Sequence, residues 1–262
     1  MARKIYFVQD YEPLFYPAGT TSALVEATYT FGFHAICNTE PLAELYRSHG
    51  GKADSFKPAI DPSIFHARSR AESSPERPVT IFNYARPGHP RNCFDIIAAG
   101  LKRVKDRLKD QALIFTAGAD WSPDQYGLGG VVEHLGLLEY KKTGQLYRAC
   151  DIGVVAMATR HPSYLPFELM ACGAVVCTNY SKYTDWLLHN GENSMLFDLS
   201  QSSVSQTILR AASDVQARKR ITSNAQSLIR DEYSDWDRTC SRIYELLFPL
   251  NEAVDAFAVE TR

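Results

Sequence analysis

Long apolar runs, which a membrane helix requires, are missing from this sequence. The longest run, residues 152–158, has the length of a strand, whereas a bilayer-spanning helix needs roughly 18 residues. The basic start is followed by only a short apolar stretch, which meets Gln9, Asp10 and Glu12, so no secretory signal forms. We therefore expect a cytoplasmic protein.

Closely spaced cysteine pairs and an excess of basic residues are also missing. The six cysteines include no Cys-x-x-Cys pair and no cluster with histidine, so no zinc site or other metal site is predicted. The 28 Lys and Arg are balanced by 30 Asp and Glu, for a net charge of −2. This balance argues against a nucleic-acid partner but is compatible with a local basic patch for a phosphorylated small molecule.

The residues that are present suit a globular protein of one large or two smaller domains. Of the 262 residues, 45% are hydrophobic and 22% are charged, which is typical of soluble folds with a substantial core. Residues 67–78 contain Ser, Glu, Arg and two prolines but almost no large apolar side chain, so they are predicted to be a linker. It separates residues 1–66 from a predicted second domain, 79–217.

Strand and helix patterns alternate after the linker. Strands are predicted at 79–84, 113–117, 131–135, 152–158, 175–178 and 194–197, and helices at 92–108, about 145–150, 166–172, near Thr184 and from about Ser202. The near-continuous apolar strand 152–158 is expected where helices cover both faces of a sheet. The sequence therefore predicts an α/β fold with a doubly wound parallel sheet. Before the linker, strands are predicted at 5–9 and 33–37, with helices at 23–29 and 41–49.

Two loops of this predicted sheet contain residues suited to binding an anion. Residues 84–92 join a strand end to a helix start and carry Arg86 and Arg91, whose planar guanidinium groups are suited to phosphate. Residues 160–168 lead into the helix that starts near Pro166, where free backbone N–H groups favour an anion and Ser163 adds a hydroxyl. Each loop also has an ordinary interpretation: solvated arginines in the first, and a structural His161 in the second. Glu168 in the first turn is equally explained by the helix dipole.

Several sequence blocks, in the same order, resemble the GT-B glycosyltransferases, in particular glycosyltransferase family 4. Arg86 and Arg91 have the spacing of the family's Gly-Arg-Leu-x-x-x-Lys pattern, and residues 168–173, Glu-Leu-Met-Ala-Cys-Gly, resemble its Glu-Ala-Met-Ala-Cys-Gly. Partial matches occur at residues 56–65 and at 233–236, which would begin a C-terminal helix, 235–248, that packs back on the first domain. The resemblance implies a GT-B fold with a complete Rossmann-like C-terminal domain and an incomplete N-terminal one, because residues 1–66 match only the last part of the first domain.

The resemblance also implies a donor site and a mechanism without a metal or other cofactor. Arg86 and Arg91 would hold the donor diphosphate, Glu168 would accept hydrogen bonds from the ribose, and the backbone near Leu137 and Leu138 would receive the base. Asp10 is the candidate catalytic base. The residues expected to bind substrate are Arg86, Arg91, Gly118, Leu137, Leu138, His161, Ser163, Tyr164 and Glu168.

One departure from the family pattern points to a subgroup. Arg160 stands where the family often has an acid eight residues before Glu168, and residues 161–164, His-Pro-Ser-Tyr, resemble rhamnosyltransferases that build rhamnose-rich surface glycans. This favours dTDP-rhamnose as the donor and a glycan or lipid-linked glycan as the acceptor, with peripheral membrane contact. Because an incomplete first domain would leave an unpaired strand edge, self-association through residues 5–37 is also expected. The alternatives are a non-catalytic nucleotide-sugar-binding module or a fragment of a larger glycosyltransferase. A GT-B epimerase or phosphorylase is disfavoured, because the sequence shows neither an acid/base cluster nor a cofactor-attachment lysine motif.

Overall fold

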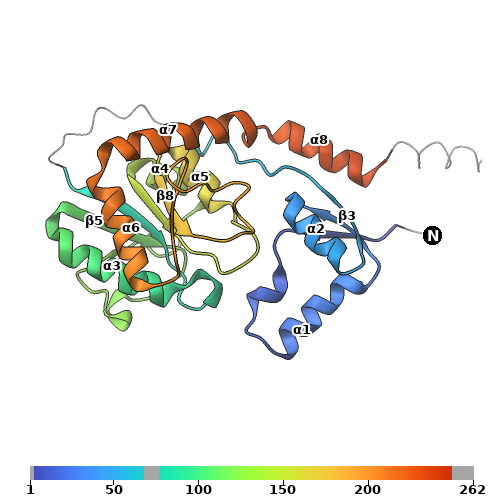
Figure 1. Cartoon of the computed structure of the whole chain (residues 1–262), viewed down its shortest axis with the longest axis horizontal. Coiled ribbons are helices and arrows are strands. Elements are labelled where there is room, and N and C mark those ends of the chain that lie inside the picture. The colour runs from blue at the N-terminus through green and yellow to red at the C-terminus, as the bar shows by residue number, and fades with distance from the viewer. Residues whose placement is uncertain (1–2, 68–76, 250–262) are drawn as a thin grey trace, which may run out of the picture. The chain divides into compact units, whose positions relative to one another are not determined.

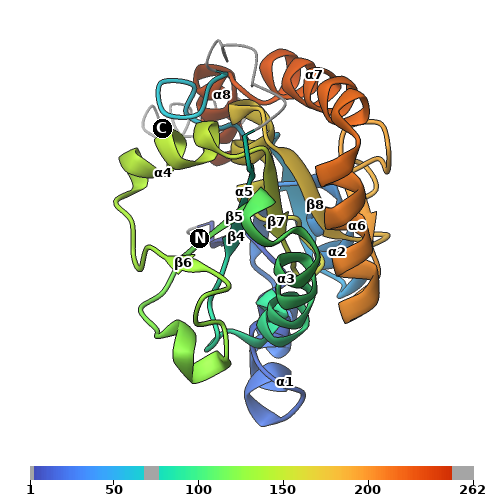
Figure 2. The same cartoon turned by 90° about the vertical axis from the view of Figure 1, so that its left-hand side faces the viewer.

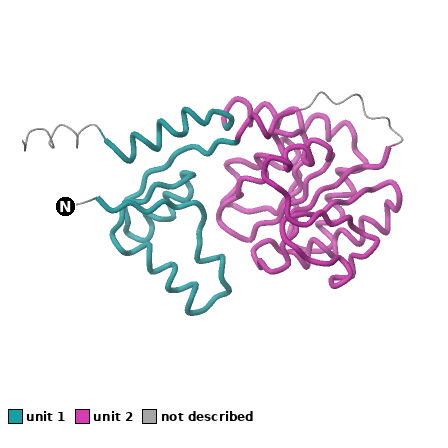
Figure 3. The backbone as a smooth tube through the Cα atoms, turned by 180° about the vertical axis from the view of Figure 1, so that it is seen from behind, with its two compact units in different colours: residues 1–60, 233–262 teal, residues 61–232 magenta. Residues whose placement is uncertain are grey.

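The structure, a computed structural model of the chain, describes residues 3–67 and 77–249 and divides into two compact units. Unit 1 comprises residues 1–60 and 233–262, and unit 2 comprises residues 61–232 (Figure 3). Unit 2 contains the whole predicted donor-binding span and continues beyond it through the helix α7 (Val215–Glu232). Most of the predicted linker, residues 68–76, lies outside the described residues.

Unit 2 is built on a parallel sheet of six strands in the order β6-β5-β4-β7-β8-β9. The chain starts at the central strand β4, moves outward through β5 to β6, and then returns to lay β7 on the other side of β4. In such doubly wound sheets, ligands bind outside the carboxyl ends of the strands at the point where the strand order reverses, here between β4 and β7. The strands are β4 (Val79–Tyr84), β5 (Ala112–Ala117), β6 (Glu133–His134), β7 (Ile152–Val155), β8 (Val175–Asn179) and β9 (Met195–Phe197).

Helices cover both faces of this sheet, as the apolar strands require (Figures 1 and 2). Ile81 of β4 packs into the main core with Leu101 of α3 (Phe94–Leu108), in the same cluster as side chains of α6 (Gln201–Ser213). Its neighbour Phe82 points to the other face and meets the ring of Tyr147, in α4 (Tyr140–Ala149), with ring centroids 5.1 Å apart. On that same face α5 (Leu165–Cys172) packs on β7. The alternation along β4 therefore fixes which helices lie on each side.

Unit 1 contains a parallel sheet of three strands in the order β1-β2-β3, with a core on each face. Side chains of α2 pack in an aromatic-rich cluster with Ala35 and Cys37 of β2, whereas Ile36 points to the opposite face and packs with Leu246 of α8. The elements are β1 (Ile5–Val8), α1 (Thr20–Ala27), β2 (His34–Cys37), α2 (Glu40–Ser48), β3 (Lys52–Ser55) and α8 (Trp236–Leu247). Short 3₁₀ helices occur at Glu12–Phe15, Thr28–Thr30, Pro90–Asn92, Lys109–Gln111 and Pro123–Tyr126.

The α/β fold class and its parallel sheets are confirmed, but some predicted elements differ. No helix forms near Thr184: residues 182–187 are turns, in which the N–H groups of Thr184 and Leu187 each donate to the carbonyl three residues earlier. The Leu187 carbonyl accepts from the side chain of Asn193. The first helix of unit 2 begins at Phe94 instead of 92, since Cys93 has a left-handed backbone, and α4 begins at 140. Strand β3 and helix α7 were not predicted. Within residues 3–67 and 77–249, none of the helices combines the length and apolar character needed to cross a bilayer.

Close packing between α3 and α6 gives a test of this fold. A Cβ at Gly100 would lie 2.5 Å from Cγ1 of Val204. Alanine should gain up to about 1 kcal/mol in helix propensity, but overpacking a filled core costs about 1–3 kcal/mol. Gly100→Ala should therefore lower the free energy of unfolding by about 1 kcal/mol, measured by urea denaturation, even though alanine is the better helix former. The loss should disappear when Gly100→Ala is combined with Val204→Ala, relative to Val204→Ala alone; two additive effects would contradict the packing argument.

Candidate functional site

The two anion-suited loops meet at the carboxyl ends of β4 and β7. The backbone N–H of Ala158, in the loop after β7, donates to the carbonyl of Arg91, in the loop after β4, over 2.7 Å. Just below, the Asn83 side chain donates to the carbonyl of Val154 over 3.0 Å. Two segments separated by more than sixty residues are thus joined at the reversal point of the sheet, the position where this fold binds ligands.

Arg86 is held in place by the side chains around it. One guanidinium nitrogen donates to the Tyr84 hydroxyl over 3.3 Å, and the other donates to Nε2 of His89 over 2.6 Å. Gly118 packs against both Tyr84 and Arg86, because a Cβ at this position would lie 2.6 Å from the Tyr84 ring and 3.3 Å from Cγ of Arg86. Gly118 also has a φ of +127°, which side-chain-bearing residues rarely adopt. Its role in the structure is therefore to position Tyr84 and Arg86.

Burial and the two nearby arginines lower the pKa of His89, so this ring is neutral at pH 7. Because its Nε2 accepts from Arg86, its proton lies on Nδ1, which is buried without a hydrogen-bond partner among the described residues. The Nε of Arg86 is also buried without a hydrogen-bond partner among the described residues. Buried donors without acceptors are costly, so both groups favour an incoming acceptor such as a phosphate oxygen.

His161, in the second loop, is fixed as a neutral hydrogen-bond donor. The backbone N–H of Ser163 donates to its Nδ1 over 3.1 Å, so the proton belongs on Nε2. Burial lowers the pKa of His161 to about 4, and the side chain is only 2% exposed. Its Nε2 has no partner among the described residues. The ring is thus oriented by the loop itself and carries an unused donor.

The start of α5 lies directly after this loop. Ser163 has a left-handed φ of 60°, and its hydroxyl accepts a long hydrogen bond, 3.4 Å, from the backbone of Leu165, at the helix start. The backbone carbonyl of Tyr164 accepts the N–H of Glu168 over 3.1 Å, and the centroid of the Tyr164 ring lies 6.1 Å from that of Phe167. Ser163 therefore supports the helix entry, and its own O–H remains available as a donor.

Glu168 is a buried acid in the first turn of α5. It is 8% exposed, and burial raises the pKa of its carboxyl group to about 7. No residue in the described chain donates a hydrogen bond to this carboxylate. Burying an ionised carboxylate without a donor costs free energy. Such carboxylates are often found in ligand sites, where a hydroxyl group of the ligand supplies the missing donor.

The predicted base-binding loop follows β6 and is tied to the rest of the site. The backbone N–H of Gly118 donates to the carbonyl of Gly136 over 3.0 Å, which places the loops after β5 and β6 side by side. Leu137 is 74% exposed, and Leu138 is partly buried. An exposed leucine next to this loop could cover the face of a planar ring.

Asp10 lies in unit 1, two residues after the end of β1. It is 7% exposed and accepts the backbone N–H of Tyr11 over 2.7 Å. Asn38, at the end of the neighbouring strand β2, is 2% exposed, and its Oδ1 has no partner among the described residues. The carboxyl edge of this sheet thus has two buried polar side chains.

Sequence reasoning missed three residues that shape the site: Tyr84, His89 and Asn179. The amide of Asn179, at the end of β8, accepts from Met157 N–H over 2.8 Å and donates to Met157 C=O over 3.1 Å, which anchors the loop after β7. The sequence signal that could have identified Asn179 is a polar residue at the end of an otherwise apolar strand. Among residues 3–67 and 77–249, no group of three or more His, Cys, Asp or Glu side chains is placed to hold a metal ion.

Comparison with known proteins identifies the family of this site. Residues 79–209, which include β4, β7 and both loops, match the family described as "WsaF, C-terminal domain". The chain belongs to the WsaF family. Its sequence is also 44% identical over 239 residues to the O-antigen biosynthesis protein RfbC of Myxococcus xanthus, covering 91% of this chain but only 18% of that protein. The chain therefore spans less than a fifth of this relative's length.

Solved structures with similar coordinates are GT-B glycosyltransferases, so the GT-B fold is shown. The Anabaena protein HepE, solved in complex with UDP and glucose, superposes with a TM-score of 0.72 at 18% identity, over 93% of this chain and 71% of its own. Sucrose-phosphate synthase from Thermosynechococcus elongatus gives a TM-score of 0.75 at 16% identity, over 95% and 68%. At these identities the likeness concerns the fold alone.

The buried Glu168 gives a prediction with a defined sign. Its folded-state pKa of about 7 lies above the ordinary value of 4.5, so the unfolded chain ionises more readily, and stability is lost as pH rises from about 4.5 to 7. Glu168→Gln removes this loss. The variant should be more stable than the wild type by roughly 3 kcal/mol at pH 8 and about equally stable near pH 4, measured by chemical denaturation.

The matched control for this measurement is Glu139→Gln, because Glu139 is an exposed acid just before α4. Its replacement should change stability little at either pH. A Glu168→Gln variant that is less stable than the wild type at pH 8 would show that the carboxylate is stabilised in the folded chain, contrary to its burial.

Proposed function

We propose that this chain is the donor-binding part of a glycosyltransferase that transfers a hexosyl group, rhamnose, from dTDP-rhamnose to a surface-glycan acceptor. The observation that carries the proposal is that the loops that contain Arg86, Arg91 and His161 follow the paired strands β4 and β7 and are joined by a backbone hydrogen bond. A diphosphate needs positive charge and hydrogen-bond donors. Arg86 and Arg91 supply the charge, and the buried neutral rings of His89 and His161 each supply an N–H donor.

In the proposed reaction, the arginines act on the leaving group. When the bond between the sugar and the diphosphate breaks, negative charge grows on the diphosphate. Arg86 and Arg91 neutralise this charge, and because Arg86 is held by Tyr84 and His89, little reorganisation is needed at that moment. The proposal requires no metal ion or other cofactor, since the arginines supply the positive charge.

The remaining predicted residues contact other parts of the donor. The Nε2–H of His161 donates to an oxygen of the sugar or of the diphosphate, and Ser163 and Tyr164 lie beside it in the same loop. Glu168 accepts from the single ribose hydroxyl of a deoxynucleoside, and Leu137 and Leu138 contact the base. Asp10 of unit 1 is proposed as the base that takes the proton from the acceptor hydroxyl.

The rhamnose assignment is supported by residues 161–164 and by the name of the relative. The His-Pro-Ser-Tyr segment forms the oriented turn around His161, and a protein 44% identical over the matched region is called an O-antigen biosynthesis protein. HepE, in contrast, was solved with UDP. A glycan or lipid-linked glycan acceptor, a cytoplasmic location, peripheral membrane contact and self-association through residues 5–37 are parts of the same proposal.

Removing Arg91 tests the phosphate contact. Arg91→Ala should weaken binding of dTDP-rhamnose by about 1.5–3 kcal/mol, the usual value of a hydrogen bond to a charged group, measured by calorimetry. The fold should survive, because the bond that joins the two loops uses the backbone carbonyl of Arg91. Arg103→Ala, an exposed position on α3, is the matched control and should bind like the wild type. Equal affinity in Arg91→Ala and Arg103→Ala would remove Arg91 from the site.

A panel of sugar nucleotides tests the donor. A ligand that binds only the folded state raises the melting temperature, so dTDP-rhamnose should give the largest rise among dTDP-, UDP- and GDP-sugars at equal concentration. A larger rise with a UDP- or GDP-sugar would overturn the rhamnose assignment. Binding of dTDP-rhamnose without transfer or hydrolysis, in an assay with a rhamnose oligosaccharide as acceptor, would instead favour the alternative of a non-catalytic binding module.

A further inference from the structure

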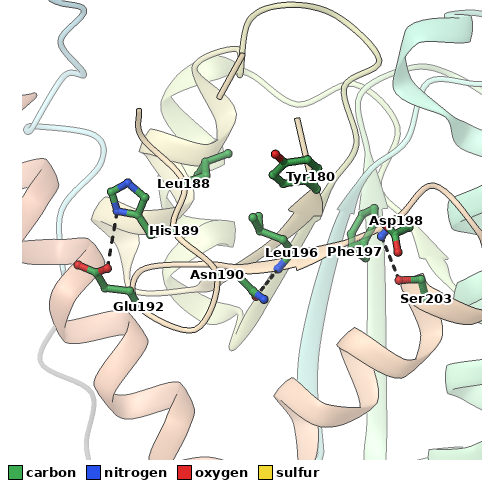
Figure 4. Close-up of a pocket in the computed structure, with 9 residues that line it drawn as sticks. All are labelled: Tyr180, Leu188, His189, Asn190, Glu192, Leu196, Phe197, Asp198 and Ser203. Atoms are coloured by element: carbon green, nitrogen blue, oxygen red, sulfur yellow. Dashed lines mark hydrogen bonds and ion pairs between the residues drawn. The ribbon is translucent and has the colours of Figure 1, made fainter. Parts of the chain in front are cut away.

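An open hollow flanks β9, an edge strand of the unit 2 sheet (Figure 4). Its volume is about 710 Å³, within the usual range of small-molecule sites. Its lining is chemically mixed. Among the apolar side chains Leu196 is partly exposed, whereas Leu188 and Phe197 are buried beneath the surface. The rest of the lining is polar or aromatic, consisting of Tyr180, His189, Asn190, Glu192, Asp198 and Ser203. The proposed donor-site residues take no part in it.

Strand β9 cannot readily accept another strand at this edge. The N–H of Leu196 donates to Oδ1 of Asn190 over 3.0 Å, and the N–H of Asp198 donates to Oγ of Ser203 over 3.0 Å (Figure 4). An added peptide strand would need these N–H groups to pair with its own carbonyls. Because side chains already occupy both, a ligand of this hollow must be recognised mainly by side chains.

The side chains that remain available suit a hydroxyl-rich, partly apolar ligand. Tyr180 is 60% exposed and offers a ring face together with a polar hydroxyl. Asp198 and Glu192 supply carboxylate acceptors for hydroxyl groups, and the Asn190 amide keeps its two N–H donors, which have no partner in the described chain. These carboxylates disfavour an anionic ligand. A neutral sugar has hydroxyl groups for this rim and C–H surfaces for the apolar side.

The hollow is linked to the donor-binding loops by a short chain of hydrogen bonds. Asn179 binds Met157 in the loop after β7, and the next residue, Tyr180, donates its backbone N–H to Phe197 of β9 over 2.9 Å. β9 is two strands from β7, which corresponds to about 10 Å at the usual strand spacing. A saccharide in the hollow would therefore lie within a few sugar units of the proposed donor.

We propose that this hollow is a second carbohydrate site, which holds a neutral stretch of the glycan chain while its end is extended. The identity of the ligand rests on the proposed function, whereas the existence of the site rests on the hollow itself. The C6 methyl group of a 6-deoxyhexose such as rhamnose would contact Leu196, the partly exposed apolar side chain of the lining, so a rhamnose chain is the expected ligand.

The test uses the full chain and four neutral tetrasaccharides, of rhamnose, glucose, mannose and galactose. Titration followed by amide NMR should show binding of at least the rhamnose chain, with shifts at Leu196 and Asp198. Tyr180→Ala and Asp198→Asn should each weaken this binding about tenfold, which equals about 1.4 kcal/mol. The controls are Tyr244→Ala, 64% exposed on α8, and Asp106→Asn, exposed on α3, and both should bind like the wild type.

Each other outcome has a definite meaning. The site is overturned if none of the four saccharides binds at 10 mM, or if both hollow variants bind as the controls do. Binding of dTDP-rhamnose, measured separately, distinguishes this failure from failure of the proposed function. Donor binding without saccharide binding rejects only the hollow, and saccharide binding that depends on Tyr180 without donor binding rejects only the donor assignment.

Discussion

The site depends on a single constraint, the pairing of β4 with β7. These strands are far apart in the sequence, but their parallel pairing brings both following loops to one edge of the sheet, where Ala158 N–H binds the Arg91 carbonyl. The contact uses backbone atoms, so it fixes the loops without consuming the charged or neutral donors on their side chains. Arg86 and His161 can then be positioned by their own loops, through His89 in one case and the Ser163 N–H in the other.

This arrangement leaves polar groups in states that folding alone does not favour. The Nε2–H of His161 and the Nδ1–H of His89 are buried without acceptors among the described residues, and Glu168 is a buried acid with a raised pKa. Each such group costs free energy in the unliganded chain, on the order of 1–3 kcal/mol for a buried unpaired donor. A ligand that has both acceptors, as in a diphosphate, and donors, as in ribose, would satisfy them together. The same residues that lower stability would thus supply affinity.

The sequence predicted the parts of the fold that local patterns determine. The apolar run at 152–158 and the Pro166-to-Gly173 helix are strong local signals, and the loops with Arg86 and His161 follow from them. Strand β3 was missed because Lys52–Ser55 has little apolar character and, among the described strands, pairs with β2 alone. The prediction of a helix near Thr184 was wrong. The Leu187 carbonyl there accepts from the side chain of Asn193, a contact that local sequence patterns do not reveal. The role of Gly118 could not be foreseen either, since it depends on a contact with Tyr84 across two strands.

Asn179 shows how the edge of the sheet and the reversal point are coupled. Its amide forms both hydrogen bonds with Met157, so the loop after β7 is held from the side of β8, and the adjacent Tyr180 joins β8 to β9. Two consecutive residues, Asn179 and Tyr180, therefore connect β9 to the loop that precedes His161. Because Asn190 and Ser203 cap the outer N–H groups of β9, this edge is protected from strand addition while its side chains stay accessible. The same two hydrogen bonds leave the neighbouring side chains as the main groups of this edge that a ligand could contact beside the loop after β7.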